Sequence, residues 1–382
     1  MRIAIDGRTL TKLKTGVGIY TERTIRSLLH IDQNIHYTLF INEDDLTLTA
    51  PNLTNVVIGN FEMMDKKRYW ENFLLPKYLK RNDIKLYFSP AYALPFTSNF
   101  PLLFPHTQDI KLVVTIHDLI AYLHPETFTA KMRLWQKLFV WNATKVSNLI
   151  IAVSESTKRD ILHYFSYPAA RITVVHNSVD EHFHPIKNVT GLNSIRDKYK
   201  LPQHFILYVG TIEPRKNVTS LARAYSILPE AIRSKYHLVL CGGLGWCSEA
   251  ILSEIDALRL GNRLIRVGYV EQQDLPAIYN LAELFVYPPL YEGFGYPPLE
   301  AMACGIPTIS SNTSSLPEVI GDAGILVNPT NYHEIAESMA SILTNSDLHQ
   351  RLAKLGRERA ALFNWKKNAL ETLEVLERAV RE

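Results

Sequence analysis

Hydrophobic residues along the chain form short continuous runs, separated by longer segments in which apolar positions recur every three or four residues. Short apolar runs rich in β-branched residues are typical of strands buried on both faces of a parallel sheet. In the first half of the chain they predict strands at Arg2–Ile5, Tyr37–Ile41, Val56–Ile58, Leu86–Ser89, Leu112–Ile116, Leu149–Val153 and Ile172–Val175. In the second half they predict strands at Phe205–Val209, His237–Leu240, Leu264–Val267, Leu284–Tyr287, Pro307–Ser310 and Ile325–Val327.

Segments with helical spacing separate most of these strands. The clearest of them predict helices at Ile19–Leu29, Lys131–Lys145, Thr157–Tyr164, Val218–Leu228, Glu271–Leu281 and Leu348–Leu362. Strands that alternate with helices imply βαβ units and a parallel sheet. The predicted fold class is therefore α/β.

The alternation of strands and helices starts again near Phe205. The polar segment from about Asp180 to Pro202 fits a linker followed by an entry helix. We therefore expect two doubly wound, Rossmann-like domains, residues 1–180 and 181–362, which face a central cleft. A last helix at 363–382 can cross back to the first domain. Open α/β sheets bind ligands beyond the carboxyl ends of their strands, so this cleft is the expected active site.

Composition narrows the function classes. The 382 residues carry a formal net charge of +3, too small to indicate a nucleic-acid partner. The three cysteines, Cys241, Cys247 and Cys304, form no CxxC pair, so neither a zinc site nor a disulfide framework is expected. The N-terminus lacks the apolar core of a signal peptide, and no apolar run reaches ~18 residues. We expect a cytoplasmic protein without a metal or other cofactor.

The first candidate site follows a strand of the second half. In Tyr208-Val-Gly-Thr-Ile-Glu-Pro-Arg-Lys-Asn217 a strand ends at Gly210 and a helix begins near the last residue. Arg215 and Lys216 thus lie at a strand's carboxyl end and beside a helix N-terminus, and both positions favour an anion. A forked arginine beside a lysine suits a diphosphate. A solvated pair of charges on a loop is the equally weighted alternative.

The second candidate site is Glu292-Gly-Phe-Gly-Tyr-Pro-Pro-Leu-Glu300, which leads from a strand into a helix. Gly293 and Gly295 let the backbone approach a ligand closely, and their amides precede a helix N-terminus. The carboxylates of Glu292 and Glu300 are seven residues apart and can contact different parts of one extended ligand. The alternative is a turn residue and a surface helix residue, but the apolar segment that follows favours a buried helix.

Three weaker signals lie in the first half. The strand of Val113-Val-Thr-Ile-His-Asp118 carries His117 and Asp118 to its carboxyl end. Spacing alone favours a core histidine and a turn-capping aspartate. Thr15-Gly-Val-Gly-Ile-Tyr20 is a partial glycine motif, for which a plain helix-start turn is the alternative. Ser89-Pro-Ala-Tyr92 follows another strand and can contact an acceptor.

Together these motifs resemble the retaining glycosyltransferases of family 4, which have the GT-B fold. That family carries an E-x7-E motif, matched by Glu292 and Glu300, and a basic pair after a Val-Gly strand end, matched by Arg215 and Lys216. The run EGFGYPPLEAMACGIPTISSNTSSLPEVIGDAGILVNP, Glu292 to Pro329, resembles the family's core almost throughout. The resemblance spans nearly the whole chain and is weaker in the first half.

The resemblance implies a role for each position, with donor binding in the second domain and acceptor binding in the first. The cations would hold the donor's diphosphate, Glu300 the ribose, and Glu292 with nearby amides the transferred sugar. The implied donor set is Gly16, Gly210, Arg215, Lys216, Tyr269, Val270, Glu292, Gly293, Phe294, Gly295, Leu299 and Glu300. The implied catalytic set is His117, Glu292, Arg215 and Lys216. The implied acceptor set is Gly18, Ser89, Tyr92 and Asp118.

The reaction implied is the transfer of a hexosyl group from a nucleotide sugar to a saccharide or glycolipid in polysaccharide biosynthesis. UDP-glucose and GDP-mannose are both candidate donors, and we lean towards a UDP-hexose. The chain has no Asp-x-Asp triplet of the kind that holds a metal, so Arg215 and Lys216 would stabilise the leaving diphosphate. The family retains anomeric configuration, and no residue stands out as a covalent nucleophile. A same-face transfer is our hypothesis.

Two other functions fit the same architecture. One is a non-hydrolysing nucleotide-sugar epimerase, and the other is a binder of nucleotide sugars without catalysis. The basic, aromatic segment Lys131–Lys145 could rest on the inner face of an anionic membrane that carries a lipid-linked acceptor. A helix packed on the first domain is the favoured alternative. Ser178 stands where the family often has glycine, which puts the backbone of the interdomain segment in doubt.

Overall fold

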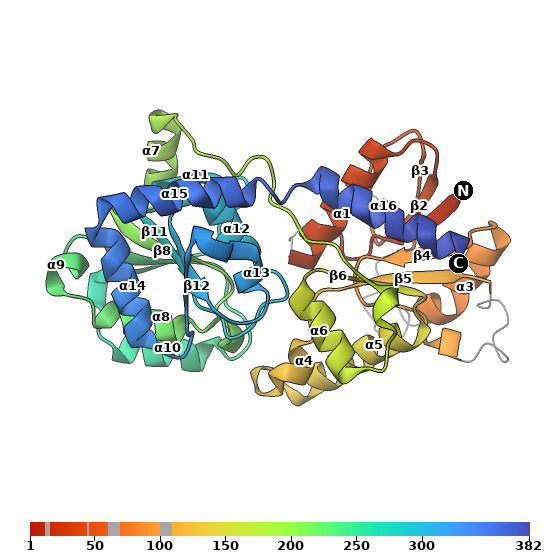
Figure 1. Cartoon of the computed structure of the whole chain (residues 1–382), viewed down its shortest axis with the longest axis horizontal. Helices are drawn as coiled ribbons and strands as arrows, with labels where there is room; N and C mark the ends of the chain where they lie inside the picture. Colours follow the sequence, from red (N-terminus) through yellow and green to blue (C-terminus); the bar gives the residue numbers. More distant parts are fainter. Residues whose placement is uncertain (12–15, 44–45, 60–68, 100–108) are drawn as a thin grey trace. The chain divides into compact units, whose positions relative to one another are not determined.

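The computed structural model describes residues 1–11, 16–43, 46–59, 69–99 and 109–382, in two compact units (Figure 1). The N-terminal unit comprises Met1–Leu123, Thr129–Asn177 and Trp365–Glu382, and the C-terminal unit comprises His124–Phe128 and Ser178–Asn364. The last helix therefore belongs to the N-terminal unit. The short segment His124–Phe128 belongs to the C-terminal unit, a feature that the sequence-based boundaries do not include.

The N-terminal unit is built on a parallel sheet, which has seven strands among the described residues, in the order β3-β2-β1-β4-β5-β6-β7. The strands are β1 (Arg2–Asp6), β2 (His36–Ile41), β3 (Leu53–Val57), β4 (Leu86–Ser89), β5 (Lys111–Ile116), β6 (Leu149–Ala152) and β7 (Ile172–Val174). The first strand lies near the middle of the sheet, so the loops after β1, β4 and β5 end at neighbouring positions on one edge.

Helices cover both faces of this sheet. They are α1 (Gly16–Ile31), α3 (Leu75–Arg81), α4 (Ile120–Leu123), α5 (Ala130–Val146), α6 (Glu155–Tyr164) and α16 (Trp365–Arg381). Residues of α1 and α16 form one apolar cluster with the sheet, and residues of α3, α5 and α6 form another. The amide of Asn368 on α16 donates to the carbonyl of His176 at 2.8 Å and accepts from the hydroxyl of Thr24 at 3.3 Å.

The C-terminal unit has a parallel sheet of six strands in the order β10-β9-β8-β11-β12-β13. Counted from its own first strand, this is the order 3-2-1-4-5-6 of a doubly wound nucleotide-binding fold, whose ligands bind where the order reverses. The strands are β8 (Phe205–Val209), β9 (His237–Cys241), β10 (Leu264–Gly268), β11 (Leu284–Tyr287), β12 (Thr308–Ser311) and β13 (Ile325–Val327). The reversal lies between β8 and β11, which pair directly.

The helices of the C-terminal unit follow the same alternation. They are α7 (Val189–Lys198), α8 (Val218–Ser226), α9 (Glu230–Arg233), α10 (Ser248–Ala257), α11 (Leu275–Leu281), α12 (Tyr296–Ala303), α13 (Leu316–Ile320), α14 (Tyr332–Thr344) and α15 (Ser346–Ala360). No helix in the described part of the chain has the length and apolar character needed to cross a bilayer.

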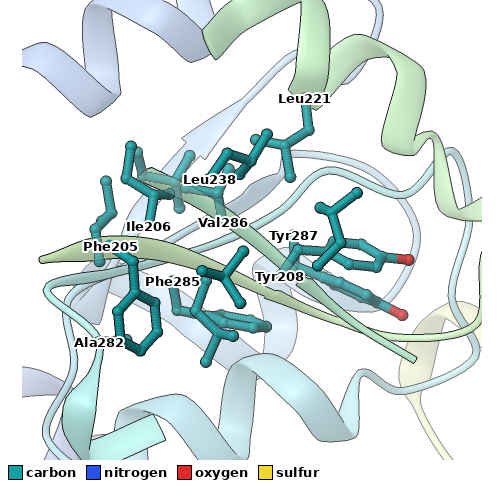
Figure 2. Packing of buried hydrophobic residues seen from close by; sticks show 14 of the residues in the cluster. Phe205, Ile206, Tyr208, Leu221, Leu238, Ala282, Phe285, Val286 and Tyr287 are labelled. Atoms are coloured by element: carbon teal, nitrogen blue, oxygen red, sulfur yellow. The ribbon is translucent and has the colours of Figure 1, made fainter. Parts of the chain in front are cut away.

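The core of the C-terminal unit reaches the edge where the candidate site lies. Phe205 and Phe285 on β8 and β11 belong to one apolar cluster with Leu238 of β9 and Leu221 of α8 (Figure 2). The rings of Tyr208 and Tyr287 stack with centroids 5.8 Å apart, and their hydroxyls point in the same direction (Figure 2). The two strands at the reversal thus place two phenols at one end of an otherwise apolar core.

Every strand predicted from the hydrophobic pattern is present in the structure, with ends shifted by at most three residues. The helix predicted over Glu271–Leu281 begins only at Leu275, because Pro276 in the first turn favours a helix start there. Ser178 is not among the described residues with positive φ. The backbone at this position therefore does not need the glycine that the family often has.

Candidate active site

The loop after β8 carries the predicted basic pair at the point where the strand order reverses. Arg215 and Lys216 lie in a short turn, Pro214–Lys216, directly before α8. Asn217 follows with a left-handed φ of 55°, a conformation that asparagine tolerates better than most residues. Its side-chain amide donates to the carbonyls of Pro288 at 2.9 Å and Pro329 at 2.8 Å. These two bonds tie the basic loop to the ends of β11 and β13.

Three donors converge on one oxygen of Glu292, which follows β11. Its Oε1 accepts from Arg215 Nη1 at 2.7 Å, from Lys216 Nζ at 2.5 Å and from the Tyr287 hydroxyl at 2.6 Å. Lys216 also donates to the Tyr287 hydroxyl. The side chains of Arg215, Lys216 and Glu292 are between 12% and 16% exposed, so the cluster is largely shielded but not sealed from solvent.

Arg215 is held from a second side. Its Nη2 donates to Glu213 Oε1 at 2.7 Å, and its Nη1 also donates to the carbonyl of Tyr291 at 3.1 Å. Glu213 is buried, and burial raises the pKa of its carboxyl while Arg215 and Lys216 act to lower it. The guanidinium is therefore fixed in place before any ligand binds.

The charges of the cluster are strongly coupled. Burial acts to raise the pKa of Glu292, but Arg215 and Lys216 together lower that pKa to about 2. Burial and then the charge of Arg215 lower the pKa of Lys216, while Glu292 acts to raise it. Two carboxylates and two cations share one shielded space, which favours the ionised form of Glu292. An arriving diphosphate would find two preoriented cations whose present partners are carboxylates.

The loop that carries Glu292 is shaped by the segment after β12. The Glu292 amide donates to Ser314 Oγ at 3.0 Å, and Ser315 Oγ donates to the carbonyls of Glu292 at 2.9 Å and Phe294 at 2.8 Å. Gly295 has a φ of 110°, and a Cβ at this position would lie 2.7 Å from Leu316 Cδ2. The positive φ and this contact leave room only for glycine at position 295. The close approach of its backbone to a ligand stays a prediction.

Glu300 lies on α12 and is 8% exposed, so it is not a surface residue. Its Oε2 accepts from the Tyr279 hydroxyl at 2.9 Å. Burial raises the pKa of its carboxyl to about 7, against smaller lowering effects of Tyr279 and His182. The carboxyl group can therefore accept hydrogen bonds from a polyol, and it changes charge near neutral pH.

This titration predicts a pH-dependent contribution to stability. The pKa of Glu300 is higher in the folded chain than in the unfolded one, so the folded chain binds more protons between about pH 4.5 and 7. The free energy of unfolding therefore falls as pH rises through this window, by about 3 kcal/mol for this group. In Glu300→Gln this loss should be absent. Urea titrations at pH 5 and pH 8 would measure it.

Glu249→Gln, which removes an exposed carboxyl from α10, is the matched control for the loss of one charge. It should keep the wild-type pH dependence. An identical fall in stability for wild type and Glu300→Gln would contradict the raised pKa.

The other residues of the predicted donor set differ in accessibility. Val270 is buried, whereas Tyr269 beside it is 62% exposed at the end of β10. Leu299 is fully buried on α12, so no part of this residue is exposed. Gly210 directly follows β8 and Gly293 directly follows Glu292. These five residues lie in the C-terminal unit with the charged cluster, whereas Gly16 of the same predicted set lies in the N-terminal unit.

In the N-terminal unit His117 follows β5 and is 9% exposed. Its Nε2 lies 2.8 Å from the carbonyl of Pro90, and because a carbonyl can only accept, this nitrogen carries the proton. Burial lowers the pKa of His117, so the ring is neutral near pH 7 and its Nδ1 can accept a hydrogen bond. Tyr20 of α1 packs edge-on against the ring, with centroids 4.9 Å apart.

These contacts bring part of the N-terminal set together. The bond from His117 to Pro90 joins the end of β5 to the Ser89–Tyr92 loop after β4. Ser89 Oγ donates to the carbonyl of Ala91, and the Tyr92 hydroxyl accepts from Gln136 at 3.3 Å. Asp118 Oδ1 accepts from the Ile120 amide at 3.2 Å, the turn-capping contact of the alternative interpretation.

The glycines of the partial motif occupy the start of α1. Gly16 is the first residue of the helix and is exposed, while Gly18 is buried within the first turns. Thr15, which opens the motif, lies outside the described residues.

Sequence reasoning did not assign three side chains that the structure places in the site. They are Tyr287 and Glu213, which contact the charged cluster, and Tyr279, which contacts Glu300. The signal for Tyr287 is a phenol at the last position of a buried strand, where the hydroxyl reaches the polar edge. The signal for Glu213 is a carboxylate two residues before Arg215 in an otherwise apolar strand and turn.

Comparison with known proteins gives a consistent picture. The family model of glycosyl transferases group 1 matches residues 193–359, and that of glycosyltransferase family 4 matches residues 15–183. O-antigen chain mannosyltransferase B of Escherichia coli is 33% identical over 270 residues, 70% of this chain and 70% of that protein. Serotype-specific mannosyltransferase WbdA of Escherichia coli is 36% identical over 68% of this chain, which spans 32% of that longer protein.

The fold is also found among solved structures. Sucrose-phosphate synthase from Thermosynechococcus elongatus superposes with a TM-score of 0.79 at 21% identity, over 100% of this chain and 99% of that one. This likeness concerns the fold alone. It confirms the predicted class, a GT-B arrangement of two Rossmann-like α/β domains.

Proposed function

Since the chain belongs to the glycosyltransferases of family 4 and is thus a glycosyltransferase, we propose that it transfers a mannosyl group from a nucleoside diphosphate sugar to a saccharide acceptor. The observation that carries the proposal is the pair of cations, Arg215 and Lys216, fixed at the strand-order reversal of the C-terminal sheet. Negative charge grows on the diphosphate as the glycosidic bond breaks, and preoriented cations in a shielded site stabilise it without reorganisation.

The choice of mannose rests on the relatives. Two of them are named as mannosyltransferases, and the activated form of mannose that we propose here is GDP-mannose. GDP-mannose replaces UDP-hexose, the donor favoured from the sequence, because no particular residue supports a UDP-hexose. A polysaccharide or a lipid-linked saccharide is the proposed acceptor, because one relative is named for the O-antigen chain.

We further propose that the transfer proceeds on one face of the sugar. The bond from the anomeric carbon to the leaving phosphate breaks, the acceptor oxygen bonds to that carbon, and the acceptor proton passes to the leaving diphosphate. Atoms and charge balance without a covalent enzyme intermediate. The neutral His117 can accept a hydrogen bond from a sugar hydroxyl through Nδ1. An inverted anomeric configuration in the product, read by NMR, would exclude this course.

A thermal-shift comparison tests the donor. A nucleotide that binds only the folded chain stabilises it by about 2.7 kcal/mol at 100 times its Kd. We expect GDP to raise the Tm, and UDP and ADP at the same concentration to leave it unchanged. A larger shift with UDP would contradict the proposed mannosyl donor. Incubation of GDP-mannose without any acceptor separates transfer from epimerisation, since an epimerase would convert the sugar.

A further inference from the structure

The helix α5 of the N-terminal unit is unusual in its charge. Its 17 residues, AKMRLWQKLFVWNATKV, include four basic residues and no carboxylate. Its buried residues are Val140, Asn142, Ala143 and Thr144, all in the C-terminal half. From Ala130 to Phe139 no residue of the helix is buried, although the helix runs beside α4 (Figure 1). The sheet therefore anchors only the end of α5.

The apolar side chains of α5 include a stripe that faces away from this anchor. Leu134, Leu138 and Trp141 are spaced by four and three residues, so they lie on one face of the helix. Leu134 is 58% exposed and Trp141 is 41% exposed, with Leu138 half-buried between them. We call these three residues the outward stripe. Val140 and Ala143, which are buried, lie on the opposite face.

Basic residues flank the outward stripe. Lys131 lies three residues before Leu134, and Lys145 lies four residues after Trp141, so both belong to the same face. The nearest preceding carboxylate in the sequence, Glu126, pairs with the Nδ1 of His124 at 3.0 Å. Apolar and aromatic residues between lysines match the interface of an anionic bilayer, where leucine and tryptophan enter the headgroup region and lysines contact phosphates.

We propose that α5 is a docking surface for an anionic lipid bilayer, bound through the outward stripe and its flanking lysines. Charge complementarity selects this occupant, because a helix with four cations and no carboxylate favours a negatively charged surface. The proposal goes beyond the transfer reaction and does not depend on it. It would bring the N-terminal unit to a membrane that presents an acceptor.

Vesicle flotation of the full chain without donor or acceptor tests the proposal. At low salt we expect binding to vesicles of phosphatidylcholine with phosphatidylglycerol and none to phosphatidylcholine alone. Leu134→Gln with Trp141→Gln should weaken binding at least tenfold, because the apolar insertion is lost. Lys131→Gln with Lys145→Gln should weaken it roughly tenfold, because two contacts to the charged surface are lost.

Leu370→Gln, which alters a side chain that is 51% exposed on α16 of the same unit, is the matched control and should bind as the wild type does. Circular dichroism melts of all variants verify folding. Wild type that fails to bind anionic vesicles would overturn the proposal, and so would stripe variants that bind equally well. Self-association of the wild type that the stripe variants lose would assign the surface to a second copy of the chain instead.

Discussion

Replacing Lys216 with alanine is expected to lower kcat about 100- to 1000-fold, the usual effect of removing one preoriented donor that stabilises charge in the transition state. The ammonium group is fixed by Glu292 and Tyr287 and is shielded from solvent, so water would replace it poorly. Binding of the free nucleoside diphosphate should also weaken. Arg215 remains in place through Glu213, which limits the damage to the site.

Two controls make this result specific. Lys235→Ala removes an exposed lysine from the same unit and should leave kcat unchanged. Lys216→Arg keeps the charge with a different shape and should lie between wild type and Lys216→Ala, since arginine and lysine are not equivalent at a fitted site. A normal kcat for Lys216→Ala, with a normal melting temperature, would remove Lys216 from the proposed diphosphate site.

Glu292→Gln should separate binding from turnover. In the structure Glu292 Oε1 accepts from both cations, so the carboxylate holds the partners that a diphosphate needs. The neutral amide attracts the cations less and does not repel a phosphate. We expect affinity for GDP to rise about fivefold, since one unit charge about 4 Å away is worth ~1 kcal/mol even in a high-dielectric setting. Turnover should fall at least 100-fold, because the carboxylate that would bind the sugar is gone.

Calorimetry with GDP and initial rates with the sugar donor measure the two effects on the same protein. Glu292→Gln should bind GDP more tightly while it turns over more slowly. Lys216→Ala should instead weaken GDP binding, so the two variants can be told apart. Glu283→Gln, at a partly exposed carboxyl before β11, is the matched control and should change neither quantity. If Glu292→Gln lost as much GDP affinity as Lys216→Ala, the diphosphate would not be replacing Glu292 as the partner of Arg215 and Lys216.

The strands could be predicted because each is a continuous apolar run buried on both faces. Phe205–Val209 and Leu284–Tyr287 were predicted with the bounds that the structure shows. The order of strands could not be read from the same pattern, since hydrophobicity does not say which strand pairs with which. The unit to which the segment His124–Phe128 belongs could not be predicted either. Nothing in its composition assigns it to the C-terminal unit, where Phe128 stacks on Trp246 with centroids 5.5 Å apart.

The candidate site could be predicted where charged residues lie at strand ends, close to glycines or a helix N-terminus. Arg215, Lys216 and Glu292 are polar residues at strand ends, and the structure brings both cations to one oxygen atom of Glu292. The supporting phenols could not be predicted, because Tyr279 and Tyr287 sit in runs that resemble ordinary core. Their hydroxyls act only through tertiary contacts with Glu300 and Glu292.

A crystal structure with GDP bound would show directly whether the two cations hold the diphosphate. We expect the diphosphate to contact Arg215 Nη and Lys216 Nζ, with Glu292 released from at least one of them. The ribose hydroxyls should lie within hydrogen-bonding distance of Glu300. A nucleotide seated elsewhere in the C-terminal unit, with the bonds from both cations to Glu292 unchanged, would contradict it.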